Sequence, residues 1–174
     1  MLRNRLQAAL VCAAFLFISC SREPKPEQAQ LYKVGDKVQA GHLYYTVVDS
    51  RWVTQLPGSP TPRLPQNRFF LVHVKAMNGS GDNTMLPNLT IEDESGKSYP
   101  ELNDGTGVPD WAGYLRKVIP AEVSQGNIVF DAPPKSYKLR VTDENGENPA
   151  LIDIPLSFGA DTGGASTPLA PKTP

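Results

Sequence analysis

A chain of 174 residues, 40% of them hydrophobic, is long enough for one folded domain. It carries 17 Lys and Arg against 18 Asp and Glu, a formal net charge of −1, which gives no electrostatic reason to expect nucleic acid or an anionic membrane surface as a partner. Both of its cysteines, Cys12 and Cys20, lie near the start, so we expect a domain without disulfides that relies on its core.

The first 19 residues have the layout of a secretory signal. Arg3 and Arg5 give a basic start, and residues 8–18 carry no polar side chain apart from the thiol of Cys12. This apolar run is shorter than the roughly 20 residues that cross a bilayer core of about 30 Å. Its length and flanks are typical of a signal peptide, and we expect residues 1–19 to be removed.

The end of this run, Leu16-Phe-Ile-Ser-Cys20, resembles a lipobox, although Phe17 stands where Leu is favoured. The resemblance implies that Cys20 is acylated, because a thiolate is needed to attack the lipid donor. Two or more acyl chains hold a protein on a membrane stably. We therefore expect a lipid anchor in a bacterial cell envelope, at the outer membrane if there are two, since Ser21 follows the cysteine. The alternative is an ordinary secretory signal that ends by coincidence in Cys20.

Three segments have compositions that disfavour regular structure. Residues 20–30 are polar and rich in charge, and they predict a flexible tether. Residues 54–66 contain four prolines and predict an extended, irregular loop, and residues 159–174 predict a disordered tail. A single domain over residues 31–158 remains.

This domain has the pattern of an all-β protein, because short runs rich in Val, Ile, Tyr and Thr alternate with turn residues. Glu94-Ser-Gly96 and Asp143-Glu-Asn-Gly146 are typical turn sequences. The connection over residues 101–113 has room for a single helical turn. In chain order, we expect strands at residues 37–39, 42–53, 68–78, 89–93, 97–100, 122–131 and 137–142, an eighth short one at 116–119, and a closing segment at 150–158.

Alternation within these runs predicts which side chains face the core. Phe70, Val72, Val74 and Ala76 share one face, and Tyr137, Leu139 and Val141 share another. Val123, Ile128 and Phe130 are further core candidates, whereas the pairs Arg116-Lys117 and Lys138 with Arg140 are expected on solvated faces. Seven or eight short antiparallel strands, each with one buried face, predict an immunoglobulin-like β-sandwich.

Several segments resemble a known family. They are Tyr32-Lys-Val-Gly-Asp36, Asn67-Arg-Phe-Phe-Leu-Val-His-Val74, Asp93-Glu-Ser-Gly96, Ile119-Pro120 with Gly126-Asn-Ile-Val-Phe-Asp131, and Tyr137-Lys-Leu-Arg-Val-Thr-Asp143. In this order they are similar to the telokin-like, immunoglobulin-like domain of unknown function of many bacterial lipoproteins, which is related in fold to a secreted immunoprotective antigen of mycobacteria. The resemblance implies a β-sandwich and supplies no catalytic residue. The chain departs from it by the insert at 54–66 and by Ala121, where the family usually has Gly.

Few residues suggest chemistry. His42 and His73 are too few and too separated for a zinc site or a hydrolytic triad, and no Gly-x-Ser-x-Gly motif is present in the expected domain. Acidic turns such as residues 143–147 lack the spacing of a calcium loop. We expect no enzyme, no cofactor and no metal.

One loop remains as a candidate for interaction. Trp111 lies in the Gly- and Pro-containing connection 101–113, with Asp110 and Tyr114 close by in the sequence, and exposed aromatic residues often contact ligands. The sequence therefore predicts a membrane-anchored protein-interaction or structural module, whose strand edges are one place to bind a protein or polymer of the envelope. The alternative is a lipoprotein that binds a small ligand, a glycan or calcium through loops 101–113 and 143–147.

Overall fold

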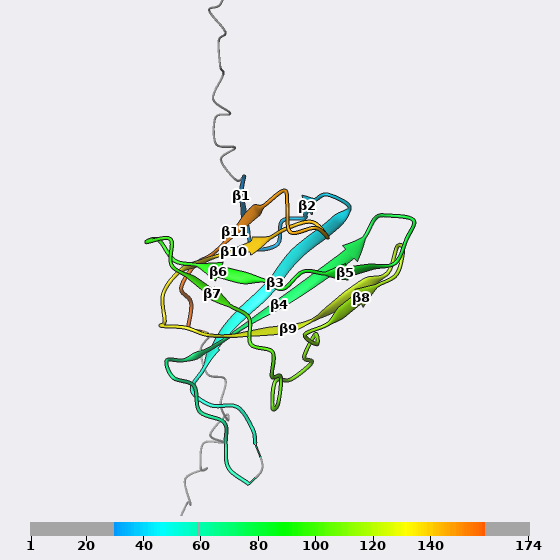
Figure 1. The fold of residues 1–174 in the computed structure, drawn as a ribbon. Coiled ribbons are helices and arrows are strands. Elements are labelled where there is room, and N and C mark those ends of the chain that lie inside the picture. The colour runs from blue at the N-terminus through cyan, green and yellow to red at the C-terminus, as the bar shows by residue number, and fades with distance from the viewer. Residues whose placement is uncertain (1–29, 59, 159–174) are drawn as a thin grey trace, which may run out of the picture.

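The computed structural model describes residues 30–58 and 60–158, which fold into strands joined by turns and loops (Figure 1). The strands are β1 (Leu31–Lys33), β2 (Val38–Ala40), β3 (Leu43–Val53), β4 (Phe69–Asn78), β5 (Thr84–Leu86), β6 (Thr90–Glu92), β7 (Ser98–Pro100), β8 (Arg116–Val118), β9 (Val123–Asp131), β10 (Tyr137–Val141) and β11 (Ala150–Ile154).

Two main sheets form the domain. One has the strand order β1-β11-β10-β6-β7 and the other β2-β3-β4-β9, while β5 and β8 form a two-stranded sheet of their own. Neighbouring strands are antiparallel, except that β1 runs parallel to β11. The two main sheets pack face to face, and the expected all-β sandwich is confirmed.

The eleven strands of residues 30–58 and 60–158 exceed the seven or eight expected, because short edge strands show little hydrophobic alternation in a sequence. β1 buries none of its three residues fully, and β5 buries only Leu86. Such strands are defined by main-chain pairing with one neighbour and show no clear alternation of hydrophobic residues. Within the described residues no helical turn forms over 101–113, and no helix is long and apolar enough to cross a bilayer.

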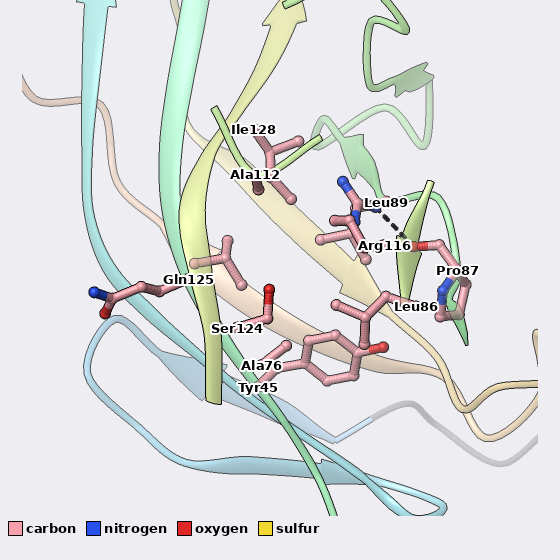
Figure 2. Close-up of a pocket in the computed structure, with 11 residues that line it drawn as sticks. Tyr45, Ala76, Leu86, Pro87, Leu89, Ala112, Arg116, Ser124, Gln125 and Ile128 are labelled. Atoms are coloured by element: carbon pink, nitrogen blue, oxygen red, sulfur yellow. Dashed lines mark hydrogen bonds between the residues drawn. The ribbon is translucent and has the colours of Figure 1, made fainter. Parts of the chain in front are cut away.

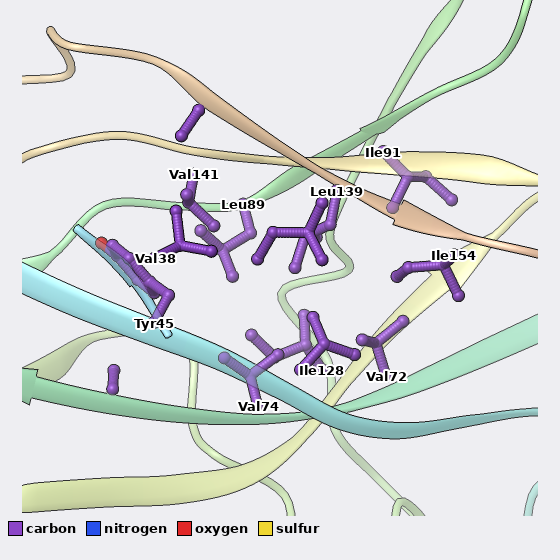
Figure 3. Packing of buried hydrophobic residues seen from close by; sticks show 14 of the residues in the cluster. Val38, Tyr45, Val72, Val74, Leu89, Ile91, Ile128, Leu139, Val141 and Ile154 are labelled. Atoms are coloured by element: carbon purple, nitrogen blue, oxygen red, sulfur yellow. The ribbon is translucent and has the colours of Figure 1, made fainter. Parts of the chain in front are cut away.

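The core lies between the two main sheets, as the alternation predicts. Val72 and Val74 of β4 point toward Leu139 and Val141 of β10 (Figure 3), and all four side chains are buried. The expectation for Val123 is wrong: it is 53% exposed, because it lies an odd number of residues from Ile128 and therefore on the opposite face of β9.

At one end of the sandwich, aromatic side chains fill the core. Trp52 stacks on Phe70 with ring centroids 4.3 Å apart, and Tyr137 packs beside both rings. The hydroxyl of Tyr137 donates to the carbonyl oxygen of Pro133 at 2.6 Å, four residues upstream. This is the arrangement of the tyrosine corner found in immunoglobulin-like sandwiches.

A smaller core covers the outer face of the four-stranded sheet. Phe69, Leu71 and Val129 point outward there, and Leu56 and Val108 are buried against them. Leu56 comes from the proline-rich segment 54–66, whose described residues are irregular as expected, and its side chain packs on the sheet.

Arg63 fixes that segment to the next loop. Leu56 and Arg63 exchange main-chain hydrogen bonds of 2.9 and 3.0 Å. The Arg63 guanidinium donates to the carbonyl oxygen of Asp104 at 2.7 Å and lies over the ring of Phe69. The insert therefore acts as a cover for the second core.

The expected signal peptide, Cys20, the tether up to residue 29 and the tail 159–174 lie outside the described residues.

Candidate functional site

Trp111 lies in a segment that runs along the outer edge of β9. The carbonyl oxygen of Asp110 accepts the N–H of Asn127 at 2.8 Å, and the N–H of Ala112 donates to the carbonyl oxygen of Asn127 at 3.1 Å. Trp111 and Asn127 thus form a parallel bridge. The Asn127 side chain adds a hydrogen bond of 2.7 Å to the carbonyl oxygen of Pro109. The segment is held by the sheet.

Two glycines let this segment approach so closely. A Cβ atom on Gly126 would lie 2.6 Å from the Asp110 carbonyl oxygen and 2.8 Å from the Ala112 Cα. A Cβ on Gly105 would lie 1.9 Å from the indole ring of Trp111, so the ring rests directly on the Gly105 backbone. Both glycines permit a contact that any side chain would block.

The structure does not gather Asp110, Trp111 and Tyr114 into one site. The Trp111 ring packs on Gly105, and the residue is 38% exposed. The Tyr114 hydroxyl instead accepts a hydrogen bond of 2.8 Å from the Asn88 side chain. Neither ring stacks on another aromatic ring among the described residues. Asp110 is exposed, with a φ of 46° that serves the bend of the main chain. Asp110 and Trp111 share the main-chain contact with Asn127 at the edge of β9, whereas Tyr114 contacts Asn88.

The two acidic turns predicted from the sequence share one geometry. In the β6–β7 hairpin, Asp93 Oδ1 accepts the N–H groups of Ser95 and Lys97 at 2.9 and 3.0 Å. After β10, Asp143 Oδ1 accepts the N–H groups of Asn145 and Glu147 at 2.9 and 2.8 Å. Each carboxylate therefore holds its own turn.

Hydrogen bonds to these carboxylates favour their charged forms. The Lys135 ammonium, 2.8 Å from Asp93 Oδ2, holds the pKa of Asp93 well below its usual value, with help from Ser95. Burial alone would raise the pKa of Asp143, but hydrogen bonds from the Asn148 side chain and from the main chain of the turn bring it below its usual value.

These hydrogen bonds occupy the Asp143 oxygens that would otherwise be available to bind a calcium ion in loop 143–147. Both Asp143 oxygens already accept hydrogen bonds, one of them from the Asn148 side-chain amide at 2.6 Å. Across residues 30–58 and 60–158, no group of three or more His, Cys, Asp or Glu side chains is placed to hold a metal ion. His73 contacts the Asn127 side-chain oxygen at 3.3 Å, and His42 is exposed.

The sequence did not reveal the buried ion pair of Arg116 and Glu101, and the expectation of a solvated Arg116 is wrong. Arg116 donates to the two carboxylate oxygens of Glu101 at 2.6 and 2.7 Å, and the two side chains are 3% and 2% exposed. Arg116 also donates to the carbonyl oxygens of Gly113 and Pro87, both at 3.0 Å, the latter shown in Figure 2. Glu101 accepts the N–H of Leu89 at 3.0 Å.

Arg116 also lines a small hollow between β9 and the segment that leads into β8. Its side-chain walls are mostly apolar, and its cavity volume is about 10 Å³. Arg116 Nε is buried and has no hydrogen-bond partner among the described residues. The lining side chains in Figure 2 are those of Tyr45, Ala76, Leu86, Pro87, Leu89, Ala112, Arg116, Ser124, Gln125 and Ile128, together with Val74.

Exposed apolar side chains surround this part of the molecule. Leu115 and Ile119, at the two ends of β8, are 81% and 49% exposed, and Met85 of the adjoining β5 is 46% exposed. Val123 begins β9. Single exposed hydrophobics are common, but four on neighbouring elements are typical of a contact surface.

The comparisons with known proteins concern the family and the fold. Residues 32–148 match the family described as Domain of unknown function (DUF4352), which confirms that part of the expected resemblance. No curated protein matches the sequence.

Solved structures similar to this chain share its fold. The yjhA protein from Bacillus subtilis has a TM-score of 0.54 at 16% identity, over 71% of this chain and 98% of that one. The secreted protein MPT63 from Mycobacterium tuberculosis has a TM-score of 0.52 at 19% identity, over 74% and 98%. A candidate lipoprotein, ycdA from Bacillus subtilis, has a TM-score of 0.50 at 13% identity, over 69% of this chain but only 38% of that one. The expected likeness to a secreted mycobacterial protein is thereby confirmed for the fold.

Proposed function

Because this chain belongs to the DUF4352 family, whose description assigns no activity, we propose a function from its own residues. It is a non-enzymatic lipoprotein of a bacterial cell envelope, anchored through Cys20, whose sandwich is a protein-interaction or structural module outside the membrane.

The anchor is supported above all by Leu16-Phe-Ile-Ser-Cys20 at the end of an apolar run. The described domain contains no cysteine and begins its first strand at Leu31, so ten residues separate it from Cys20. The structural relatives fit this setting, since one is a candidate lipoprotein and another is a secreted protein. An acylated Cys20 would hold such a domain at the bilayer without a transmembrane helix.

A binding role is supported because the charged side chains that could take part in catalysis already stabilise the fold. Asp93 and Asp143 hold turns, and Arg116 and Glu101 neutralise each other inside the fold. On the outer face of the five-stranded sheet, Lys138 lies between Glu92 and Asp153, and Arg140 pairs with Glu92 at 3.5 Å, so positive and negative charges offset each other there. The features of the domain that can bind a partner are its surface shape, its exposed apolar side chains and its strand edges.

The anchor is tested by replacing Cys20 with Ala in the full chain and fractionating cells that make it. We expect the native protein in the membrane fraction, labelled by a fatty-acid analogue, and the variant without label and released from the membrane. Cys12→Ala is the matched control, since the signal peptide carries that thiol away. Membrane retention of the unlabelled Cys20→Ala protein would refute the lipid anchor.

A further inference from the structure

We propose that the open part of the β9 edge, Val123 to Gln125, binds one extended peptide segment of a partner protein, which adds to the sheet as a strand and places a small side chain in the hollow beside Arg116. The inference rests on the proposed role as an interaction module and names its binding surface and the class of partner.

The main chain of β9 has free groups along this stretch. Asn127 and Val129 direct their N–H and carbonyl groups away from β4, because they bond to residues 110–112 and to Leu102. Outward direction alternates along a strand, so Gln125 and Val123 point the same way. Neither residue has a main-chain partner on that side among the described residues.

The side chains here do not protect the edge. Natural edge strands are usually blunted by charge, proline or a bulge. Residues 123–127 read Val-Ser-Gln-Gly-Asn and contain no charged residue and no proline.

On the opposite side of this sheet, β2 pairs only with Leu43 to Tyr45 of β3, and the rest of β3 shows such protection. The register of β3 shifts between Val47 and Asp49, which places a bulge at Val48, and Asp49 and Arg51 follow with exposed charged side chains. β7 has three residues and ends in Pro100. The open stretch of β9 is therefore the better template for a peptide strand.

The hollow sets which side chain the peptide carries. Ser124 and Ile128 line it from β9, and Val74 and Ala76 line it from β4, so it continues the inner face of the sheet past the edge strand. An added strand would direct alternate side chains to this face. Because its cavity volume is about 10 Å³, the hollow accepts a group the size of a methyl, which favours Ala or Ser.

Arg116 is a charged residue in the wall of the hollow, and its charge is paired with Glu101. Its two terminal nitrogens bond to Glu101, Gly113 and Pro87. The Glu101 carboxylate already neutralises Arg116, so the chemistry selects a neutral peptide group over a free anion.

The test uses the full chain, purified from whichever cell fraction holds it, and a display library of random nine-residue peptides. We expect enrichment of peptides with alternating β-branched residues around a central Ala or Ser. The best peptide, made synthetically, should slow the hydrogen exchange of the Val123 and Gln125 amides at least about tenfold. The cell fraction in which the protein is found tests the lipid anchor, whereas peptide binding tests the β9 edge. Either proposal can therefore fail while the other holds.

Gln125→Pro removes the outward N–H without removing a bond to β4, and Gln125→Ala is the matched control that keeps it. Binding that survives in Gln125→Ala and weakens at least about tenfold in Gln125→Pro would support the edge. If Gln125→Pro does not fold, Ala112→Leu fills the hollow from the opposite wall and should weaken binding likewise. Failure to enrich any peptide, peptides that bind without protecting these amides, or a dimer of the chain that Gln125→Pro dissociates would each overturn the proposal.

Discussion

Replacing Glu101 with Gln removes the negative charge from the buried pair with Arg116 and leaves the side chain nearly the same size. In the native protein, the Glu101 carboxylate accepts three hydrogen bonds, two from Arg116 and one from the N–H of Leu89. Gln keeps one acceptor oxygen but turns an NH₂ group toward the guanidinium. The positive charge of Arg116 then stays buried without a counterion.

The expected cost follows from the burial of both side chains, which are 3% and 2% exposed. Removing one partner of a buried ion pair costs about 3–5 kcal/mol, because the remaining charge is uncompensated. The retained bonds of Arg116 to Gly113 and Pro87 place the cost near the lower end, at about 3 kcal/mol, a large share of a typical domain stability.

Urea unfolding at neutral pH measures this cost as a change in the free energy of unfolding. Glu94→Gln is the control, since Glu94 is exposed at a turn, and it should change stability by no more than about 0.5 kcal/mol. Arg116→Met should be less damaging in the Glu101→Gln background than alone, because the charge it removes is already unpaired. A Glu101→Gln cost below about 1 kcal/mol, or strict additivity with Arg116→Met, would refute the buried pair.

Three further predictions concern turns and the β9 edge. Ala121 is the third residue of the turn Ile119–Glu122 and has a φ of 60°, a strained value for a residue with a Cβ atom. Ala121→Gly should therefore stabilise the domain by about 0.5–1 kcal/mol in urea unfolding, and a loss of stability would contradict the strain. Gly126→Ala should lower the urea midpoint and red-shift the tryptophan emission by displacing residues 110–112; an unchanged spectrum would count against their close packing. The folded state holds the pKa of Asp93 below 3.8, so this carboxylate stabilises the fold above that pH; Asp93→Asn should lower the melting temperature at pH 7, and the difference should shrink as the pH falls below 3.8, whereas a constant difference would refute the linkage.

Local patterns predicted much of the fold. Alternation along residues 68–78 and 137–142 placed both inner faces, because a strand with one buried face must repeat every two residues. The turns at Asp93 and Asp143 were also predictable, since Asp and Gly at these spacings satisfy the turn by themselves. The family's Gly at position 121 now has a reason, because Ala121 adopts a positive φ.

Long-range partners were not predictable from these patterns. Arg116 and Glu101 are fifteen residues apart, and neither shows in the sequence that the other will neutralise it inside the fold. Leu56 stands among prolines with no repeating neighbour, so its burial on Phe69 and Leu71 follows only from the way the insert folds back. The same holds for Trp111, whose contact with Gly105 depends on a bridge to β9.

The central claim is that the domain is held outside a membrane by lipid on Cys20, and intact-mass spectrometry of the protein from its native envelope tests it most directly. We predict a chain that starts at residue 20 and carries the added mass of a diacylglycerol group on that cysteine. A chain that still starts at Met1, or one whose residue 20 carries no added mass, would contradict the account.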